Sequence, residues 1–181
     1  MNVVDPIRRE QFCQIKDEIR RSTDYLVVGI DVAKHKHNAF MGSATGKSLL
    51  RRLVFENNLS GYCKLLERVK AIKAQNAFSK VVFGIEPTGN YHKPLARHLI
   101  KCAQHVVLVT GVAVKNNREL LNNRWDKNDT KDAANVADLV SRGRCHFYDL
   151  PDMNLRDIRN LLSLRKRLKK QEHRLITRIR N

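Results

Sequence analysis

The sequence predicts an α/β protein in which helices pack on a mixed β-sheet. Apolar stretches of strand length at residues 24–31, 80–89 and 105–110 are typical of strands buried on both faces. Two more strand candidates, around 37–41 and 49–56, follow the first stretch directly. Segments with helical spacing of apolar residues surround the later strands, and this arrangement favours one sheet with helices packed on it.

The first half of the chain begins with an amphipathic helix over residues 6–21 and continues into three strands. The strands are expected to form a meander, because "GSATGKS" between the second and third supplies turn residues. Residues 59–74 follow as a helix whose apolar residues are spaced for one buried face. The apolar residues of this helix are Leu65, Leu66, Val69 and Ile72.

The second half alternates strands and helices. Pro87 and Gly89 end the strand "KVVFGIEPTG". The elements expected after it are helices over 90–103, 112–121 and 129–142, with a strand over 105–110 between the first two. The predicted order is three strands followed by helix, strand, helix, strand and helix. This order matches the ribonuclease H-like arrangement.

The chain divides into three predicted parts. Residues 1–24 form an N-terminal helical extension, 25–150 the α/β domain, and 151–181 a basic helix. The basic helix keeps an approximate leucine seam up to Asn181 and shows no glycine or proline stop signal, which predicts that the natural protein is longer.

The charge distribution favours a polyanionic partner. The net charge is +17, with residues 1–24 neutral, residues 25–150 at +10 and residues 151–181 at +7. Each phosphate that a lysine or arginine neutralises releases condensed counterions, so such a surplus favours nucleic acid. A solvated basic surface without a partner is the alternative.

The composition excludes several other classes of protein. The sequence has no apolar run long enough to span a membrane and no signal-peptide pattern at its start. Its four cysteines are far apart and form no Cys-x-x-Cys pair, which indicates a reduced, cytoplasmic protein. "GSATGKS" is one residue too short for a phosphate-binding P-loop and precedes a strand, so a hairpin turn is favoured.

Four acidic residues stand where burial is expected. Asp31 ends the first apolar strand and Glu86 ends the strand "VVFGIE". Asp129 and Asp132 fall on the inward side of the helix over 129–142, beside the apolar stripe of Ala133, Val136 and Val140. Unpaired buried carboxylates cost several kcal/mol each, a penalty that bound divalent ions remove.

These acids predict a site for Mg²⁺ or Mn²⁺, with two ions able to clamp a phosphodiester. Structural roles remain open for each residue. Asp31 could instead form a turn, and Glu86 could accept hydrogen bonds from nearby backbone N–H groups. Asp129 could be the N-cap of its own helix. Asp126 and Asp138 are expected at the surface.

Three motifs together resemble one known family. "GIDVAK" (29–34), "EPTGNYHKPLA" (86–96) and "KNDTKDAANVADL" (127–139) resemble the N-terminal RuvC-like domain of DEDD transposases of the insertion-sequence one-ten family, which are related to the invertase Piv. The spacing of the last two acids also looks like that of the resolvase RuvC. The resemblance covers residues 25–180.

The resemblance implies a metal-binding quartet that falls on Asp31, Glu86, Asp129 and Asp132. It also implies DNA recombination directed by a structured bridge RNA, and assembly into a homo-oligomer, either a dimer or a tetramer. In the family a serine of a C-terminal domain is proposed to link covalently to DNA. The chain stops before that domain, so no serine is assigned.

Further residues are candidates for contact with nucleic acid. Thr88, Gly89 and Asn90 stand where a helix is expected to start, and N–H groups at such a position favour a phosphate. The other candidates are Lys34, Tyr91, Lys127, Arg165, Lys166, Arg167, Lys169 and Lys170. Trp125 and His92 are less specific, because core packing explains either one.

Three other functions are weighed against a transposase. A DEDD exonuclease carries Asp-x-Glu in its first motif, whereas Asp31 is followed by Val32 and Ala33. An actin-like sugar kinase needs a second similar half, for which the chain has no room. A nucleic-acid-binding module with structural acids remains the non-enzymatic alternative.

Overall fold

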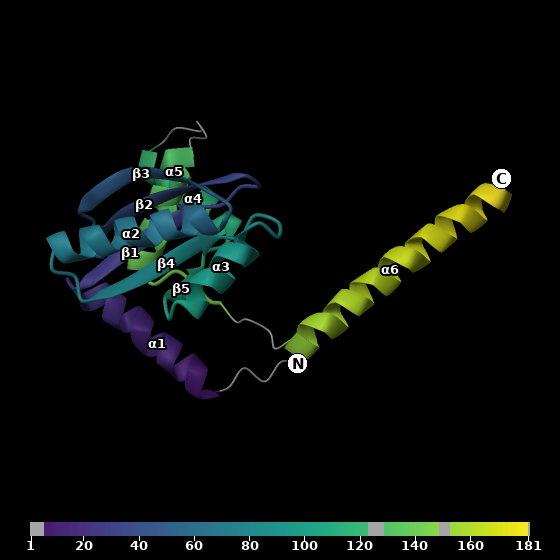
Figure 1. The fold of residues 1–181 in the computed structure, drawn as a ribbon, viewed down its shortest axis with the longest axis horizontal. Helices are drawn as coiled ribbons and strands as arrows, with labels where there is room; N and C mark the ends of the chain where they lie inside the picture. The colour runs from purple at the N-terminus through teal and green to yellow at the C-terminus, as the bar shows by residue number, and fades with distance from the viewer. Residues whose placement is uncertain (1–5, 123–128, 149–152, 181) are drawn as a thin grey trace. The chain divides into compact units, whose positions relative to one another are not determined.

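The computed structural model describes residues 6–122, 129–148 and 153–180. The chain forms two units, Met1–Tyr148 and Asp149–Asn181. In the described part of the first unit, six strands form one sheet in the order β3-β2-β1-β4-β5-β6 (Figure 1). The strands are β1 Tyr25–Asp31, β2 Lys36–Ser43, β3 Ser48–Glu56, β4 Lys80–Glu86, β5 His105–Leu108 and β6 His146–Phe147. The helices are α1 Pro6–Arg21, α2 Leu59–Gln75, α3 His92–Lys101, α4 Gly111–Asn122, α5 Asp129–Ser141 and α6 Met153–Arg180.

The strand directions confirm the ribonuclease H-like fold. Strands β1, β2 and β3 form an antiparallel meander, and β4 and β5 continue the sheet parallel to β1. The turn between β2 and β3 is the hairpin expected from "GSATGKS", closed by a 2.9 Å hydrogen bond from Ser43 N–H to the Lys47 carbonyl. Gly46 adopts φ +94° in this turn, a conformation that favours glycine.

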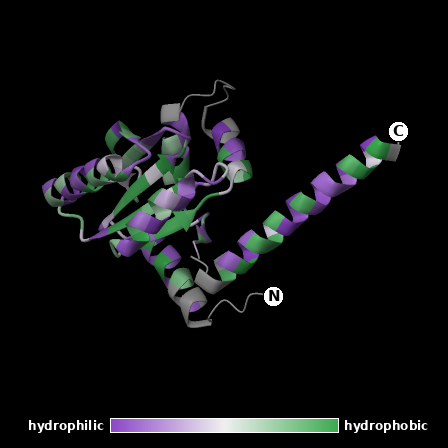
Figure 2. Ribbon diagram, turned by 45° about the vertical axis from the view of Figure 1, so that its right-hand side comes forward, coloured by the Kyte–Doolittle hydropathy of each residue, from purple (hydrophilic) through white to green (hydrophobic). Residues whose placement is uncertain are grey.

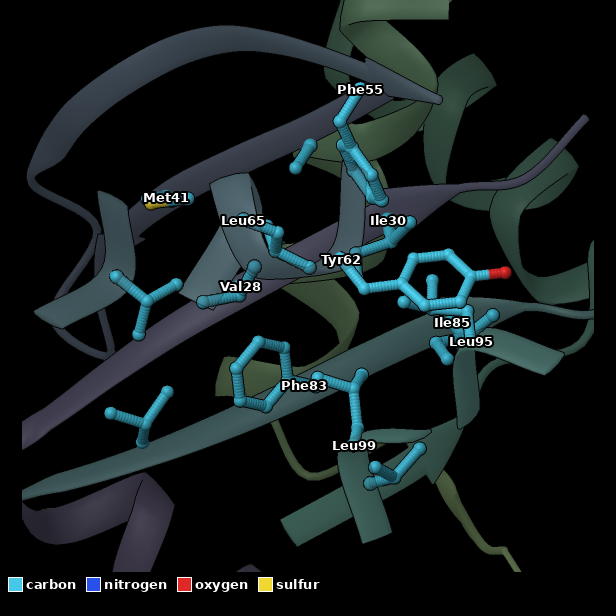
Figure 3. Close-up of a cluster of buried hydrophobic side chains, with 14 of the residues drawn as sticks. Val28, Ile30, Met41, Phe55, Tyr62, Leu65, Phe83, Ile85, Leu95 and Leu99 are labelled. Carbon is cyan, nitrogen blue, oxygen red and sulfur yellow. The ribbon is translucent and has the colours of Figure 1, made fainter. Parts of the chain in front are cut away.

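Each face of the sheet carries its own apolar core. Alternate residues of a strand point to opposite faces, so Leu26, Val28 and Ile30 of β1 face helices α2 and α3. Phe83 and Leu65 are fully buried in the same cluster (Figure 3). On the other face Tyr25 and Val27 belong to a second cluster, which includes residues of α1 and α5. Each large apolar side chain buried in this way contributes about 1.5–3 kcal/mol.

Two glycines allow α5 to lie directly on the sheet. Gly29 of β1 and Gly84 of β4 are Cα partners in the parallel register. A Cβ atom on Gly29 would lie 2.1 Å from the Ala133 carbonyl oxygen, and one on Gly84 would lie 2.4 Å from Val140 Cγ2. Both distances are shorter than real contacts, so α5 packs this closely only because neither residue has a side chain.

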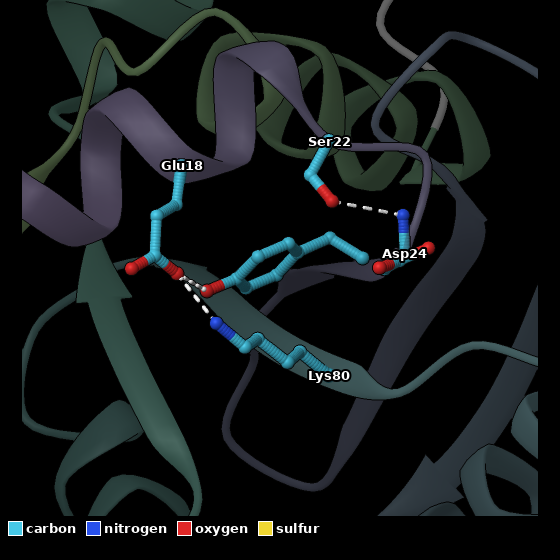
Figure 4. A network of polar contacts seen from close by, with 5 residues as sticks. Glu18, Ser22, Asp24 and Lys80 are labelled. Carbon is cyan, nitrogen blue, oxygen red and sulfur yellow. Dashed lines mark hydrogen bonds and ion pairs between the residues drawn. The ribbon is translucent and has the colours of Figure 1, made fainter.

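Helix α1 is attached at the opposite end of β1 and β4 from their acidic residues. Glu18 accepts a hydrogen bond of 2.9 Å from the Tyr25 hydroxyl and forms an ion pair of 2.6 Å with Lys80 (Figure 4). Ile19 is fully buried in the core. The ion pair is exposed and therefore stabilises only weakly, so the apolar contact is what holds the helix.

Helix α6 forms the second unit and has an amphipathic sequence whose apolar side chains are exposed. Its leucines and isoleucines alternate with basic residues along the helix (Figure 2). Leu161, Leu168 and Ile179 are 65%, 55% and 84% exposed. Among the described residues, no helix is long and apolar enough to cross a membrane.

Two details differ from the sequence prediction. No strand was predicted after residues 105–110, but His146–Phe147 add the short strand β6, antiparallel to β5. Asp138 was expected at the surface, but its side chain is only 29% exposed and pairs with Arg142 at 3.1 Å. It also accepts a 2.9 Å hydrogen bond from Asn117 of α4. Helix α4 thus contacts α5 at Asp138, and single-helix periodicity does not reveal such a contact.

Candidate metal and nucleic-acid site

The candidate site begins with a row of residues across one edge of the sheet. Val54 of β3 pairs with Asn38 of β2, and Asn38 pairs with Asp31 of β1. Asp31 in turn pairs with Glu86 of β4. Asp31 and Glu86 lie two residues after Gly29 and Gly84, so they share the sheet face on which α5 packs. The adjacent parallel strands thus bring two carboxylates to the same edge.

Helix α5 adds a third carboxylate to this edge. Asp132 is 3% exposed, and Ala133, Val136 and Val140 beside it are fully buried, as the periodicity of the sequence predicts. The side chain of Asp129 lies outside the described residues, so its predicted place in the quartet stays a prediction. Asp31, Glu86 and Asp132 all line one cleft.

Asp132 is engaged by an arginine of the neighbouring helix. A guanidinium nitrogen of Arg118 in α4 donates to Asp132 Oδ1, and the two side chains are 19% and 4% exposed. A buried carboxylate needs such a partner, since an isolated buried charge is costly. The sequence analysis did not identify Arg118, because nothing in the sequence indicates that residues 14 positions apart on two helices meet.

Glu86 lies against the start of α4. A Cβ atom on Gly111, the first residue of this helix, would lie 2.9 Å from Glu86 Oε1. The carboxylate therefore occupies the space that a side chain at position 111 would take. The helix N-terminus carries a partial positive charge, which favours a carboxylate at this place.

The cleft has a volume of about 640 Å³ and carries several basic residues. Lys34 and Lys36 lie at the β1–β2 connection, Arg52 lies on β3, and Lys115 and Arg118 lie on α4. Carboxylates at the edge of the sheet are thus flanked by cations on two sides. Lys36, Arg52 and Lys115 were not identified from the sequence, because their position in the cleft depends on the pairing of β2 with β3 and on the packing of α4.

The residues expected to contact nucleic acid are distributed unevenly. Lys34, Thr88 and Tyr91 line the cleft. Gly89 and Asn90 are exposed in the turn before α3, which begins only at His92. Lys127 and Trp125 lie outside the described residues. Arg165, Lys166, Arg167, Lys169 and Lys170 are all exposed on α6.

Two buried histidines support the loops around the cleft. His37 is fully buried, packs edge-on against Phe55 at 5.2 Å, and accepts a 3.2 Å hydrogen bond at Nδ1 from the Ala33 N–H. This bond fixes the connection that follows Asp31. His92 is 7% exposed and packs against Tyr148 at 6.0 Å, so it has a structural role. Burial lowers the pKa of both histidines.

We expect the stability of the first unit to fall as the pH is lowered from 7 to 5. The unfolded chain takes up protons near the ordinary histidine pKa of about 6.5, whereas the folded protein keeps His37 and His92 neutral to lower pH, so protons favour unfolding. Urea unfolding across this range measures the slope. His37→Asn should reduce the slope, and replacement of the exposed His146 is the control. A slope that His37→Asn leaves unchanged would contradict this role.

The donor set suits a hard divalent ion. Asp31, Glu86 and Asp132 offer carboxylate oxygens, which Mg²⁺ and Mn²⁺ prefer. Among the described side chains, no group of three acids, histidines or cysteines is arranged to hold a metal ion. The cation that contacts Asp132 is Arg118. The chemistry of the donors therefore fits such an ion, and one of them, Asp132, also accepts a hydrogen bond from Arg118.

A family model for transposases, DEDD_Tnp_IS110, matches residues 28–181. The match includes all six strands except the first three residues of β1, and it includes every acid of the predicted quartet. No curated protein matches the sequence.

Solved structures with related folds are distant in sequence. RuvC of T. thermophilus, in complex with a Holliday junction substrate, is 11% identical with a TM-score of 0.41 over 65% of this chain and 91% of RuvC. The ethanolamine utilization protein EutJ from Carboxydothermus hydrogenoformans is 13% identical with a TM-score of 0.32, over 66% of this chain and 51% of EutJ.

Proposed function

Because the chain belongs to the IS110-type DEDD transposase family, we propose that its first unit is a metal-dependent catalytic domain that acts on DNA phosphodiesters. The observation that carries this proposal is the pairing of Asp31 with Glu86 at the ends of β1 and β4, with Asp132 in the same cleft. Asp31, Glu86, Asp129 and Asp132 are the proposed metal ligands.

Two Mg²⁺ or Mn²⁺ ions held by these acids would supply Lewis-acid stabilisation of the phosphate and activate the nucleophile. The chain itself contributes fixed positions for the ligands. Because α5 packs closely on Gly29 and Gly84, the distance between Asp132 and the sheet is fixed. The contact with Gly111 limits where the Glu86 carboxylate lies. Such positioning keeps ligand oxygens ready before substrate binds.

The basic residues of the cleft are the proposed contacts of the DNA backbone. Lys34, Lys36 and Arg52 form one side and Lys115 the other, with the acids between them. A phosphate of the DNA strand is attracted by these cations and brought to the acidic edge. Thr88 and Tyr91, which also line the cleft, can donate hydrogen bonds to the same backbone.

DNA binding tests this path without any catalysis. In EDTA, Arg52→Gln and Lys115→Gln should each weaken DNA affinity and lower the slope of log affinity against log salt by about 1. Lys70→Gln is the matched control, because Lys70 is exposed on α2, which packs on the other face of the sheet. Fluorescence anisotropy over a salt series measures both quantities. Equal slopes for wild type, the two cleft variants and the control would contradict the proposal that the DNA backbone binds along the cleft.

The basic helix α6 is the proposed contact for a structured guide RNA. Its exposed Arg165, Lys166, Arg167, Lys169 and Lys170 place five cations within six residues. Such a density suits the closely spaced phosphates of folded RNA. The exposed leucine seam of the same helix agrees with a homo-oligomer, either a dimer or a tetramer.

A further inference from the structure

The ion pair between Arg118 and Asp132 poses a problem for the proposed metal site. Asp132 Oδ1 accepts from Arg118, and the Asp132 side chain is 4% exposed. With so little of this carboxylate open to water, few directions remain from which an ion can approach it. Arg118 occupies one of them.

A guanidinium and a divalent ion compete for the same carboxylate. Both are cations, and their mutual repulsion is strong where water is largely excluded. The described acids do not converge on one point to hold an ion while Arg118 contacts Asp132. The Arg118 guanidinium therefore lies beside Asp132 where it would compete with a divalent ion for this carboxylate.

We propose that Arg118 is the resident counter-ion of Asp132 and that it leaves this carboxylate when the site takes a divalent ion. This inference rests on the proposed metal-binding function. Arg118 and Lys115 are three residues apart on α4, so they share a helix face, and both line the cleft. A released Arg118 therefore stays within the cleft, where it meets the DNA backbone beside Lys115.

The contacts of Arg118 agree with an exchangeable partner. Its Nε is buried and has no hydrogen-bond partner among the described residues, so within that part of the chain the guanidinium is held only through its terminal nitrogen. Its side chain is 19% exposed, which leaves a path toward the open cleft. Arg142, in contrast, pairs with Asp138 at 3.1 Å four residues earlier on α5, and neither residue lines the cleft.

The proposal is tested by Mn²⁺ titration of wild type, Arg118→Gln and Arg142→Gln. Calorimetry gives the affinity, and the unfolding midpoint with and without Mn²⁺ gives a second readout that applies even if a variant is less stable without metal. Arg118→Gln should bind Mn²⁺ about five- to tenfold more tightly than wild type, a typical coupling between two sites. Its midpoint should rise more than that of wild type. Arg142→Gln removes the same charge and should bind as wild type does, and Arg118→Lys should lie close to wild type.

Each other result has a definite meaning. Unchanged or weaker Mn²⁺ binding by Arg118→Gln overturns the competition and makes Arg118 a residue that orients Asp132. Equal gains in Arg118→Gln and Arg142→Gln overturn it as well, because general charge then explains the effect. Binding that is absent in all variants overturns this inference together with the metal site. Binding that Asp31→Asn abolishes but Arg118→Gln leaves unchanged overturns this inference alone.

Discussion

Gly29→Ala is expected to destabilise the first unit by more than about 3 kcal/mol, beyond the range usual for an overpacked core. The added Cβ would lie 2.1 Å from the Ala133 carbonyl oxygen and 2.5 Å from the Ala137 nitrogen. Both atoms are backbone, so the conflict cannot be relieved by a side-chain rotation. Helix α5 must move off the sheet, and Asp132 moves with it.

Urea and thermal unfolding measure this loss. At about 2–4 °C per kcal/mol for a protein of this size, the unfolding midpoint should fall by roughly 6–12 °C or more. Gly84→Ala should cost less, because the closest atom is a methyl group of Val140. Gly111→Ala is the control, since the closest atom there is a side-chain oxygen of Glu86 at 2.9 Å, which can be displaced by a side-chain rotation. If Gly29→Ala lowers the free energy of unfolding by less than about 1 kcal/mol, the close packing of α5 on the sheet is contradicted.

Asp31→Asn is expected to reduce recombination at least a hundredfold while the protein stays folded. Even residues that only support metal ligands cost about 10–100-fold when replaced, and a ligand should cost more. The substitution keeps the shape of the side chain and removes its charge. A recombination assay in cells with the full-length protein, with protein levels measured alongside, gives the result.

The matched control for this variant is Asp17→Asn, which removes an exposed carboxylate from α1 at the other end of β1. It should recombine as wild type does. Retained activity in Asp31→Asn would contradict a catalytic role of Asp31 and would make this acid structural, as it is in the alternative of a nucleic-acid-binding module. Such a module should also bind nucleic acid equally well with EDTA present.

The fold was predictable because its elements have strong local patterns. The runs that became β1 and β4 are apolar enough to indicate strands buried on both faces, and each ends in an acid. The positions of Ala133, Val136 and Val140 predicted the inward face of α5, on which Asp132 is buried. Short β6 lacked such a pattern, because two residues are too few to show a period.

The details of the site depend on contacts between distant segments. The repeated Gly-Ile-acid sequence in β1 and β4 is visible in the chain, but its meaning appears only when Gly29 and Gly84 become register partners below α5. The pairing of Arg118 with Asp132 likewise requires the packing of α4 on α5. Such contacts leave no periodic signal in the sequence.

The most direct test of the metal site is thermal unfolding of wild type, Asp31→Asn and Asp17→Asn over a series of Mn²⁺ concentrations. A ligand at 100 times its Kd adds about 2.7 kcal/mol to a folded protein, which corresponds to roughly 5–10 °C here. Wild type and Asp17→Asn should gain this stability when Mn²⁺ is added, whereas Asp31→Asn should show only a small part of the gain. Equal shifts in all three proteins, or no shift in any, would contradict a divalent-ion site at the ends of β1 and β4.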